Sequence, residues 1–416
     1  MKTKRILALI LTLLMLLPCF LTAAFAEDDG DWLVHESMIN EQGYVCTKET
    51  MKSSYGAKHV YTYTFDKAGR LLTSAESNRE ADGVKFSNTK TCTYNKAGDL
   101  ITEAYSFRDS SGYFERYLAV YTYDEKGNLT KETFNSQNEE GTEVNVRKLT
   151  YDAKGNKIKT VIDHRQADGI TSRDVFTFTY DKQNRVIKKK VASTSNTDLV
   201  SYLTVKYTFK NGRLAKETSV EKSGYGSDLS TTRKTIAHTY DKKGNEIQTV
   251  TRETSDGFSR TEKTTRTFDR QKHLLTETTV CKYSDGSVMK AEKSWTYDAK
   301  GFLTKHAEAQ KDSNGGSSKL TETFVNDKKG NPVKQTSVQT YDGETTKTVE
   351  QISYDKKGRE TTHKSTVRSQ DGSVTRYTYV YTYDKAGNPV KTVVTIRDAE
   401  GTGKEVYTAA YQKVTK

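Results

Sequence analysis

Histidine and carboxylate side chains are the groups in this chain best suited to ligate a metal ion or to transfer protons. The histidines are spread along the whole sequence, at His35, His59, His164, His238, His273, His306 and His363. Only the last two fall at equivalent points of the repeat described below, and they would lie two repeats, about 19 Å, apart. No zinc-type Cys/His spacing, phosphate-binding glycine loop or nucleophile elbow occurs. The sequence therefore predicts no metal site, no cofactor and no enzymatic activity.

Three cysteines, Cys46, Cys92 and Cys281, remain once the N-terminal leader described below is removed. An odd number of cysteines in an oxidising compartment cannot all pair within one molecule. In a simple meander Cys46 and Cys92 would lie three strands, roughly 14 Å, apart, which is beyond disulfide reach. We therefore expect thiols that fill core positions rather than a disulfide framework.

A tyrosine-aspartate anchor followed by a tight turn recurs every 28 to 31 residues. The aspartate position is occupied by Asp66, Asn95, Asp124, Asp152, Asp181, Lys210, Asp241, Asp269, Asp298, Asp327, Asp355 and Asp384. Such periodicity is typical of a repeat array, in which each unit buries its apolar face only against its neighbours. Catalysis needs unlike groups converging at one place, which an array of this kind does not favour.

The turn after each anchor has a clear sequence mechanism. Aspartate at its first position accepts hydrogen bonds from the N–H groups two and three residues on, and the following glycine takes a left-handed conformation. The predicted turn residues are Asp66, Gly69, Asp124, Gly127, Asp152, Gly155, Asp241, Gly244, Asp298, Gly301, Asp355, Gly358, Asp384 and Gly387. Asn184 is a good substitute for glycine, whereas Lys272 predicts a distorted turn. Calcium binding is the alternative role, but one carboxylate per turn supplies too few oxygens.

The residues before each anchor alternate with period two, as a strand with one buried face requires. One face carries large apolar residues, and the candidate ligand-contact aromatics on it are Tyr63, Tyr121, Phe178, Tyr207, Trp295, Phe324 and Tyr381. The other face carries threonine in ten of the twelve copies. We expect a cohesive aromatic face and a threonine face exposed to water.

A second turn, marked by dipeptides such as Asp82-Gly83 and Asp168-Gly169, divides each repeat into two strands. The predicted fold is all-β: a twisted antiparallel β-hairpin repeat array of about 24 strands in 12 repeats. With about 20° of twist between neighbouring strands, the array should coil into a superhelix or spiral. Its end strands would then be open edges, blunted by lysine-rich segments such as residues 412–416.

The first residues predict secretion. Lys2, Lys4 and Arg5 precede an apolar run over residues 6–21, and Ala24-Phe25-Ala26 resembles a signal-peptidase site. The run is shorter than the roughly twenty residues of a spanning helix, so we expect no transmembrane span after cleavage. The expected organisation is a signal peptide over 1–26, a lead-in with the first hairpin over 27–58, and the repeat domain over 59–416. We expect a secreted or extracellular protein, and association with the cell surface is compatible with this expectation.

The mature chain carries a net charge of +9, with 63 basic and 54 acidic residues. Lysine alternates with glutamate and threonine along the sequence, which favours solvated strand faces over nucleic-acid binding. Loose attraction to an anionic cell-wall polymer stays open, as does binding to a glycan or a protein.

The run Tyr-x-Tyr-Asp-x-x-Gly-Asn/Arg-Leu, seen at residues 121–129 and with Pro389 in place of leucine at 381–389, resembles the tyrosine-aspartate (YD) repeats of the bacterial rearrangement-hotspot (Rhs) family. The resemblance covers about 330 residues and implies β-hairpins that spiral into a long strip, in proteins with surface, adhesion or toxin-delivery roles. The repeats here are longer than those of the family, no Asp-Pro dipeptide occurs, and no toxin domain follows Lys416. The shell-and-cargo mechanism is therefore not carried over.

Two non-enzymatic functions are compatible with these patterns. The first is a secreted bacterial surface-associated binding or adhesion module. The second is a structural spacer or scaffold without a specific ligand, or a fragment of an Rhs-like shell. A binding module should leave several of the aromatic-face rings exposed in a concave groove, whereas a spacer should bury these rings along its whole length.

Overall fold

The protein is all-β in the computed structural model, which describes residues 39–40, 43–313 and 315–414. The expected signal peptide, 1–26, and residues 27–38 of the expected lead-in lie outside the described residues. No helix in the described part has the length and apolar character needed to cross a membrane. The strands are β1 Tyr44–Ser53, β2 Lys58–Phe65, β3 Leu71–Arg79, β4 Lys85–Tyr94, β5 Leu100–Asp109, β6 Phe114–Tyr123, β7 Leu129–Asn138, β8 Gly141–Tyr151, β9 Lys157–Arg165, β10 Thr171–Tyr180, β11 Val186–Ser195, β12 Leu199–Lys210, β13 Arg213–Tyr225, β14 Asp228–Tyr240, β15 Glu246–Ser255, β16 Phe258–Phe268, β17 Leu274–Tyr283, β18 Val288–Tyr297, β19 Leu303–Asp312, β20 Ser317–Asn326, β21 Pro332–Tyr341, β22 Glu344–Tyr354, β23 Glu360–Arg368, β24 Val374–Tyr383, β25 Pro389–Asp398 and β26 Gly401–Lys413.

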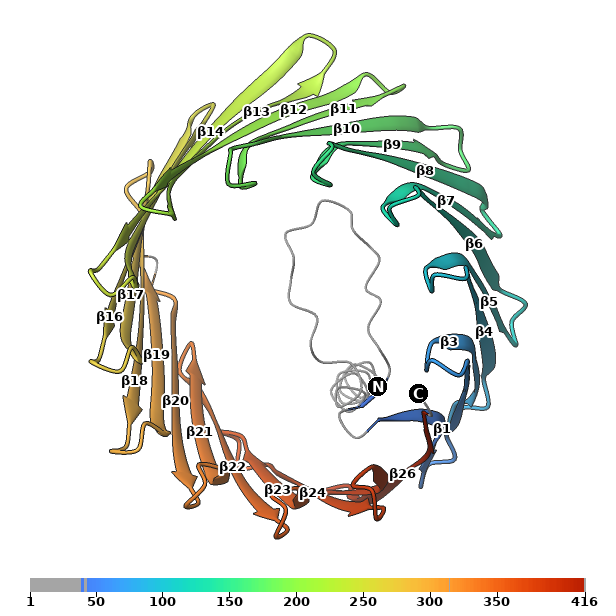
Figure 1. Cartoon of the computed structure of the whole chain (residues 1–416). Helices are drawn as coiled ribbons and strands as arrows, with labels where there is room; N and C mark the ends of the chain where they lie inside the picture. The colour runs from blue at the N-terminus through green and yellow to red at the C-terminus, as the bar shows by residue number, and fades with distance from the viewer. Residues whose placement is uncertain (1–38, 41–42, 314, 415–416) are drawn as a thin grey trace.

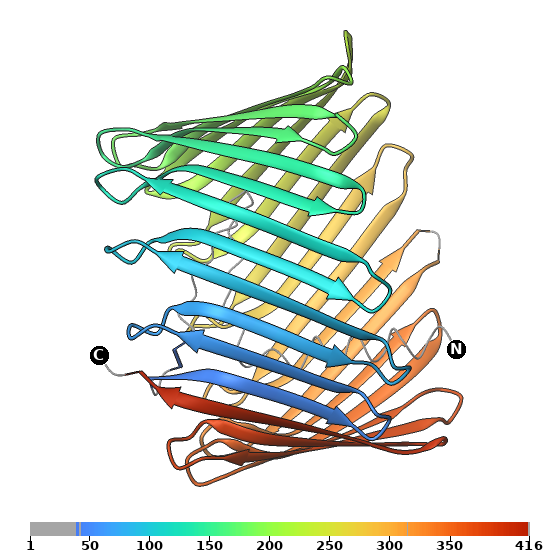
Figure 2. The same cartoon turned by 90° about the vertical axis from the view of Figure 1, so that its right-hand side faces the viewer.

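These 26 strands form one antiparallel sheet that closes on itself (Figure 1). Each strand pairs with its neighbours in sequence, and β26 returns to pair with β1 from Tyr44↔Lys413 to Ser53↔Glu405. Figure 2 shows the blue first strand beside the red last strand, with the other hairpins following one another around the wall. The architecture is a closed barrel around one axis, and the prediction of an open superhelix or spiral is wrong.

Closure has a local cause that recurs in every repeat. We call the turn that follows each tyrosine-aspartate anchor the Asp-turn. The register of strand pairing shifts by one residue immediately before each of these turns, for example between Thr64 and Phe65 and between Thr122 and Tyr123. Equivalent shifts occur in the other ten copies. A β-bulge bends its strand and raises the local twist, so bends repeated in phase curl the sheet until its edges meet. Pairing of the edges then satisfies their backbone groups, and blunting by the C-terminal lysines is not needed.

The Asp-turn is held by the aspartate carboxylate and by a left-handed third residue. In the turn after β6, Asp124 Oδ1 accepts hydrogen bonds from the N–H groups of Lys126 and Asn128, at 2.9 and 2.8 Å. The N–H of Gly127, whose φ is 83°, donates to the backbone carbonyl of Asp124 instead. In this turn the carboxylate thus serves the residues two and four positions on, whereas the predicted bond from the third residue occurs at Asp384 and Asn95, whose Oδ1 atoms accept from Gly387 and Gly98. Hydrogen bonding by Asn128 is the largest cause that lowers the pKa of Asp124.

Two turns lack glycine yet keep this geometry. Asn184 has φ 59° and Lys272 has φ 73°. Asp269 Oδ1 still accepts hydrogen bonds from the N–H groups of Gln271 and His273, at 2.8 and 2.9 Å. The distortion expected at Lys272 is therefore absent, and the hydrogen bonds of the turn offset the strain of a left-handed lysine.

The anchor tyrosines connect successive turns. Each hydroxyl donates a hydrogen bond to a backbone carbonyl in the preceding repeat. That carbonyl belongs to the first or second residue of the strand that leaves the preceding turn. The pairs are Tyr94–Leu71, Tyr123–Leu100, Tyr151–Leu129, Tyr180–Lys157, Tyr240–Leu214, Tyr297–Leu274, Tyr354–Pro332 and Tyr383–Glu360, at 2.7–3.2 Å. Asn326, the one copy without an aromatic ring at this position, makes the equivalent bond from Nδ2 to the Leu303 carbonyl at 2.8 Å.

The two faces of the sheet differ in exposure. All ten threonines of the threonine face are exposed. The aromatic face holds buried residues such as Cys92, Ala119 and Cys281. Side chains converge on the concave side of a curved sheet and splay apart on the convex side. The aromatic face is thus the lumen face of the barrel, and the threonine face is its outward face.

A buried apolar cluster also lies on the lumen face. Cys92, Leu100, Ala119 and Tyr121 are buried together, with Phe134 and other apolar residues packed against them. The three described cysteines are free, and Cys92 and Cys281 are buried. Cohesion within the wall thus comes from side chains of neighbouring strands, in keeping with a repeat protein.

Candidate functional site

The seven candidate ligand-contact aromatics lie on the lumen face and none is exposed. Tyr121 is buried, and the other six, Tyr63, Phe178, Tyr207, Trp295, Phe324 and Tyr381, are half-buried. Trp295 stacks on His306 with ring centroids 5.1 Å apart, and the Tyr63 hydroxyl donates to Glu49 Oε2 at 3.3 Å. Their burial does not match the exposed aromatic groove expected of a binding module.

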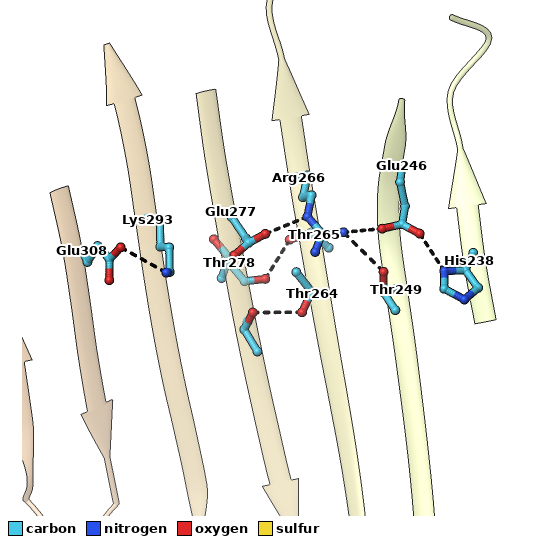
Figure 3. A network of polar contacts seen from close by, with 11 residues as sticks. His238, Glu246, Thr249, Thr264, Thr265, Arg266, Glu277, Thr278, Lys293 and Glu308 are labelled. Carbon is cyan, nitrogen blue, oxygen red and sulfur yellow. Dashed lines mark hydrogen bonds and ion pairs between the residues drawn. The ribbon is translucent and has the colours of Figure 1, made fainter. Parts of the chain in front are cut away.

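Polar side chains on the lumen face form chains of contacts across several strands. In Figure 3, Arg266 on β16 bridges Glu246 on β15 and Glu277 on β17, with both N···O distances 2.7 Å. His238 on β14 extends the chain through Nδ1 to Glu246 Oε1 at 2.6 Å. Further round the wall, Lys293 on β18 contacts Glu308 on β19 at 3.1 Å. Such a network fixes strand register because each charge needs its partner opposite.

A second lumen-facing cluster combines tyrosines with a carboxylate. Glu103 accepts a hydrogen bond from the Tyr117 hydroxyl at 2.5 Å and pairs with Lys90 at 2.6 Å. The Tyr117 ring stacks on Tyr105, with centroids 5.2 Å apart, and lies 5.0 Å from Phe134. Burial, and then the hydrogen bond to Glu103, raise the pKa of Tyr117, which keeps its hydroxyl a donor at neutral pH.

The histidines are paired with carboxylates, not with one another. All six described histidines contact an aspartate or glutamate, at 2.6–3.6 Å. His306 and His363, the two in the same phase, contact different carboxylates. Within the described residues, no three His, Cys, Asp or Glu side chains come together in a way that could hold a metal ion. His35 lies outside the described residues.

The outward face carries threonine and basic side chains and almost no acid. Alternation along the paired strands leaves only two strand carboxylates on this face of the described chain, Asp163 and Glu292. Both are neutralised locally: Asp163 pairs with Arg173 at 3.4 Å and Glu292 with Lys290 at 2.7 Å. Glutamates that follow an outward lysine in sequence, such as Glu132 after Lys131, point into the lumen instead.

This sorting of charge was missed by sequence reasoning, although a signal was present. Lysine recurs seven residues after the anchor aspartate, at Lys131, Lys159, Lys188, Lys305, Lys334 and Lys391. Along the sequence, alternation of lysine with glutamate predicts an even mixture of charges. In a strand, adjacent residues point to opposite faces, so the same alternation separates the two signs across the wall.

Six lysines lie on the outward face of β7–β12. We call this set the lysine band: Lys131, Lys148, Lys159, Lys188, Lys190 and Lys206. Lys131 and Lys148 are direct cross-strand partners, as are Lys188 and Lys206. Lys159 and Lys190 flank Thr177 from either side. Five of the six are exposed and Lys188 is half-exposed. Within the described part of the chain, none of them forms an ion pair.

Comparison with known proteins adds little to this geometry. No family model and no curated protein matches the sequence. Among solved structures, a TcdB2-TccC3-Cdc42 complex has 13% identity and a TM-score of 0.20, covering 87% of this chain and 23% of that chain. This chain thus spans about a quarter of that protein's length. The P pilus usher PapC translocation pore has 7% identity and a TM-score of 0.37, covering 89% and 98%, respectively. A porin-like protein from Bacteroides uniformis has 14% identity and a TM-score of 0.23, covering 54% and 97%.

Proposed function

We propose that this protein is a secreted, non-enzymatic, surface-associated binding or adhesion module that contacts its ligand through the outward face of the barrel. The observation that carries the proposal is the separation of charge across the wall. Exposed threonine and lysine face outward, while the seven candidate aromatics and nearly all strand carboxylates face the lumen. A surface of one sign attracts a partner of the other sign and raises its local concentration.

The position of the aromatics favours this face over the one first expected. Rings that bind glycans or proteins contribute through exposed area, and the seven candidates are buried or half-buried against neighbouring strands. The outward threonines offer a hydroxyl in nearly every repeat, and the lysines offer mobile cations on long stems.

Retention on purified bacterial cell walls at physiological salt tests the proposal. We expect the mature protein to remain bound to walls and to be released by high salt, since contacts between exposed charges are screened. A matched neutral resin gives the background. Loss of the protein in the wash, at the same rate from walls and from resin, would contradict a binding function.

A structural spacer or scaffold is the second candidate, and one observation favours it. None of the seven candidate aromatics is exposed, as expected of a protein whose rings only hold its strands together. The wall-retention assay separates the two functions, because a spacer without a ligand is not retained.

We also propose that the chain is a divergent member of the YD-repeat group. The support is the anchor motif in phase through the array, together with a hairpin turn at every copy. A profile built from these twelve repeats should match YD-repeat proteins better than it matches unrelated β-hairpin repeats of equal composition.

A further inference from the structure

The lysine band is an unneutralised row of cations on a rigid wall. Lys131 faces Lys148, and Lys188 faces Lys206, across single strand pairings. Like charges directly opposite each other on a sheet are destabilising, so their placement costs stability. The one carboxylate on the outward face of these strands, Asp163, is already paired with Arg173. A ligand of negative charge would relieve this repulsion.

The band also has a defined spacing. Neighbouring strands lie about 4.8 Å apart, so the six lysines, which stand on five of the six strands from β7 to β12, span roughly 25 Å. Threonine hydroxyls lie between them, with Thr177 between Lys159 and Lys190. A linear chain with one anionic group at about each strand spacing could lie across the band and meet several ammonium groups at once.

We propose that the lysine band binds a linear polyol-phosphate chain, a polymer of phosphodiester-linked units without bases. This assignment rests on the proposed binding function and names the surface and the ligand class within it. Lysine is a compact point charge suited to single phosphate oxygens, and threonine supplies further donors to phosphate or polyol hydroxyls. Release of counterions from the polymer supplies the free energy of binding.

A nucleic acid is less well matched by the same surface. Proteins that bind single strands stack successive bases on aromatic side chains. Among the described residues, the outward face of β7–β12 has one aromatic side chain, Tyr202, four residues along the strand from Lys206. The band can therefore neutralise phosphates but offers no row of rings for bases.

The test measures binding of poly(glycerol phosphate) to the mature protein at about 50 and about 200 mM salt, with an oligo-dT of equal phosphate number and neutral dextran as comparisons. The band variant is K131Q/K148Q/K206Q. The matched control is K305Q/K334Q/K391Q, which removes the same charge at one fixed position of other repeats. Each control lysine lies between uncharged cross-strand partners. All six positions are exposed, so both variants should stay folded, the control at the wild-type thermal midpoint and the band variant, which removes the repulsion between facing lysines, at that midpoint or above it.

We expect the wild type to bind poly(glycerol phosphate) more tightly than oligo-dT and not to bind dextran. The band variant should lose about tenfold or more in affinity at low salt, with a salt slope smaller by about 2. The control variant should lose less than about threefold. Equal loss in both variants would assign binding to the net charge of the whole barrel and overturn the band.

Failure of the ligand assignment can be distinguished from failure of the proposed function. If the wild type stays on walls stripped of phosphate polymers as well as on intact walls, the binding function holds and the polyol-phosphate assignment is wrong. Tighter binding to oligo-dT would likewise replace the assignment with a nucleic acid. If intact walls do not retain the protein, the proposed function itself fails.

Discussion

The hydroxyl of Tyr123 donates a hydrogen bond to the backbone carbonyl of Leu100, 2.9 Å away, and so joins the turn of one repeat to the first strand residue after the preceding turn. Leu100 is only 2% exposed. A carbonyl in such a place cannot easily replace the phenol with water, so the ring and its hydroxyl act together. Seven other tyrosines make the same bond, and Asn326 makes it without a ring.

Replacing Tyr123 with phenylalanine should lower the free energy of unfolding by about 1–2 kcal/mol, because the Leu100 carbonyl loses a donor while the ring is kept. Urea unfolding followed by circular dichroism measures the change. The matched control is Tyr113→Phe, since Tyr113 is exposed and its hydroxyl makes no hydrogen bond within the described chain. An equal loss of unfolding free energy in both variants would count against a stabilising role for the hydrogen bond from Tyr123 to Leu100.

Two leucines on opposite faces of the wall should respond differently to truncation. Leu100→Ala removes a buried side chain from the cluster around Cys92 and Tyr121 and should cost about 2–5 kcal/mol of unfolding free energy. Leu118→Ala removes an outward side chain that is 44% exposed and should change stability by about 0.5 kcal/mol or less. Denaturant midpoints of the two variants measure the difference. Comparable losses would mean that the outward face is covered in solution.

An engineered disulfide between β1 and β26 tests whether the barrel is closed. Thr50 and Thr408 are direct partners there, and facing residues of an antiparallel pair lie about 4.5–5.5 Å apart at Cα, within disulfide range. In a Cys46→Ser background, Thr50→Cys with Thr408→Cys should form an intramolecular crosslink, read by mass spectrometry of the monomer. Thr50→Cys with Thr382→Cys should not, since β24 lies three pairings from β1, about 14 Å away. A monomer that crosslinks in neither variant would indicate an open sheet.

His363 should make stability depend on alkaline pH. Its Nδ1 lies 3.4 Å from Glu360 and its Nε2 3.6 Å from Glu350. Interaction with Glu350 first, and then with Glu360, raises the pKa of His363 from 6.5 to about 9. The pKa is raised on folding, so the stabilisation is fully present below pH 6.5 and is lost as pH rises towards 9.

Thermal midpoints of the wild type and of His363→Gln between pH 6 and pH 10 should therefore converge as pH rises through about 9. The 3.6 Å separation of Nε2 from Glu350 is an ion-pair contact and too long for a hydrogen bond, which limits the size of the effect. A constant difference between the two proteins over this range would show that the charge of His363 does not contribute.

Much of the local structure could be predicted from the sequence. The two-strand repeat, the left-handed glycines and the opposite character of the two faces all follow from short-range patterns, as the exposed Thr122 beside the buried Tyr121 illustrates. Closure could not be predicted, because it depends on how the bulge at every Thr–Tyr step adds up over the array.

The distribution of charge over the two faces also could not be predicted from the order of residues along the chain. Lys131 and Glu132 cancel in a count along the chain, yet they lie on opposite sides of the wall. The surface that emerges depends on register between strands, since Lys131 meets Lys148 only through the pairing of β7 with β8. Neither relation is visible in composition or net charge.

The contact between β1 and β26 has a consequence for how such a molecule can change size in evolution. Each described hairpin of this ring has a strand neighbour on both sides, so duplication or loss of a whole hairpin would widen or narrow the circumference without creating a bare edge. The circumference of the barrel would then change in steps of one hairpin. Insertion of a single strand would instead leave one strand without an antiparallel neighbour.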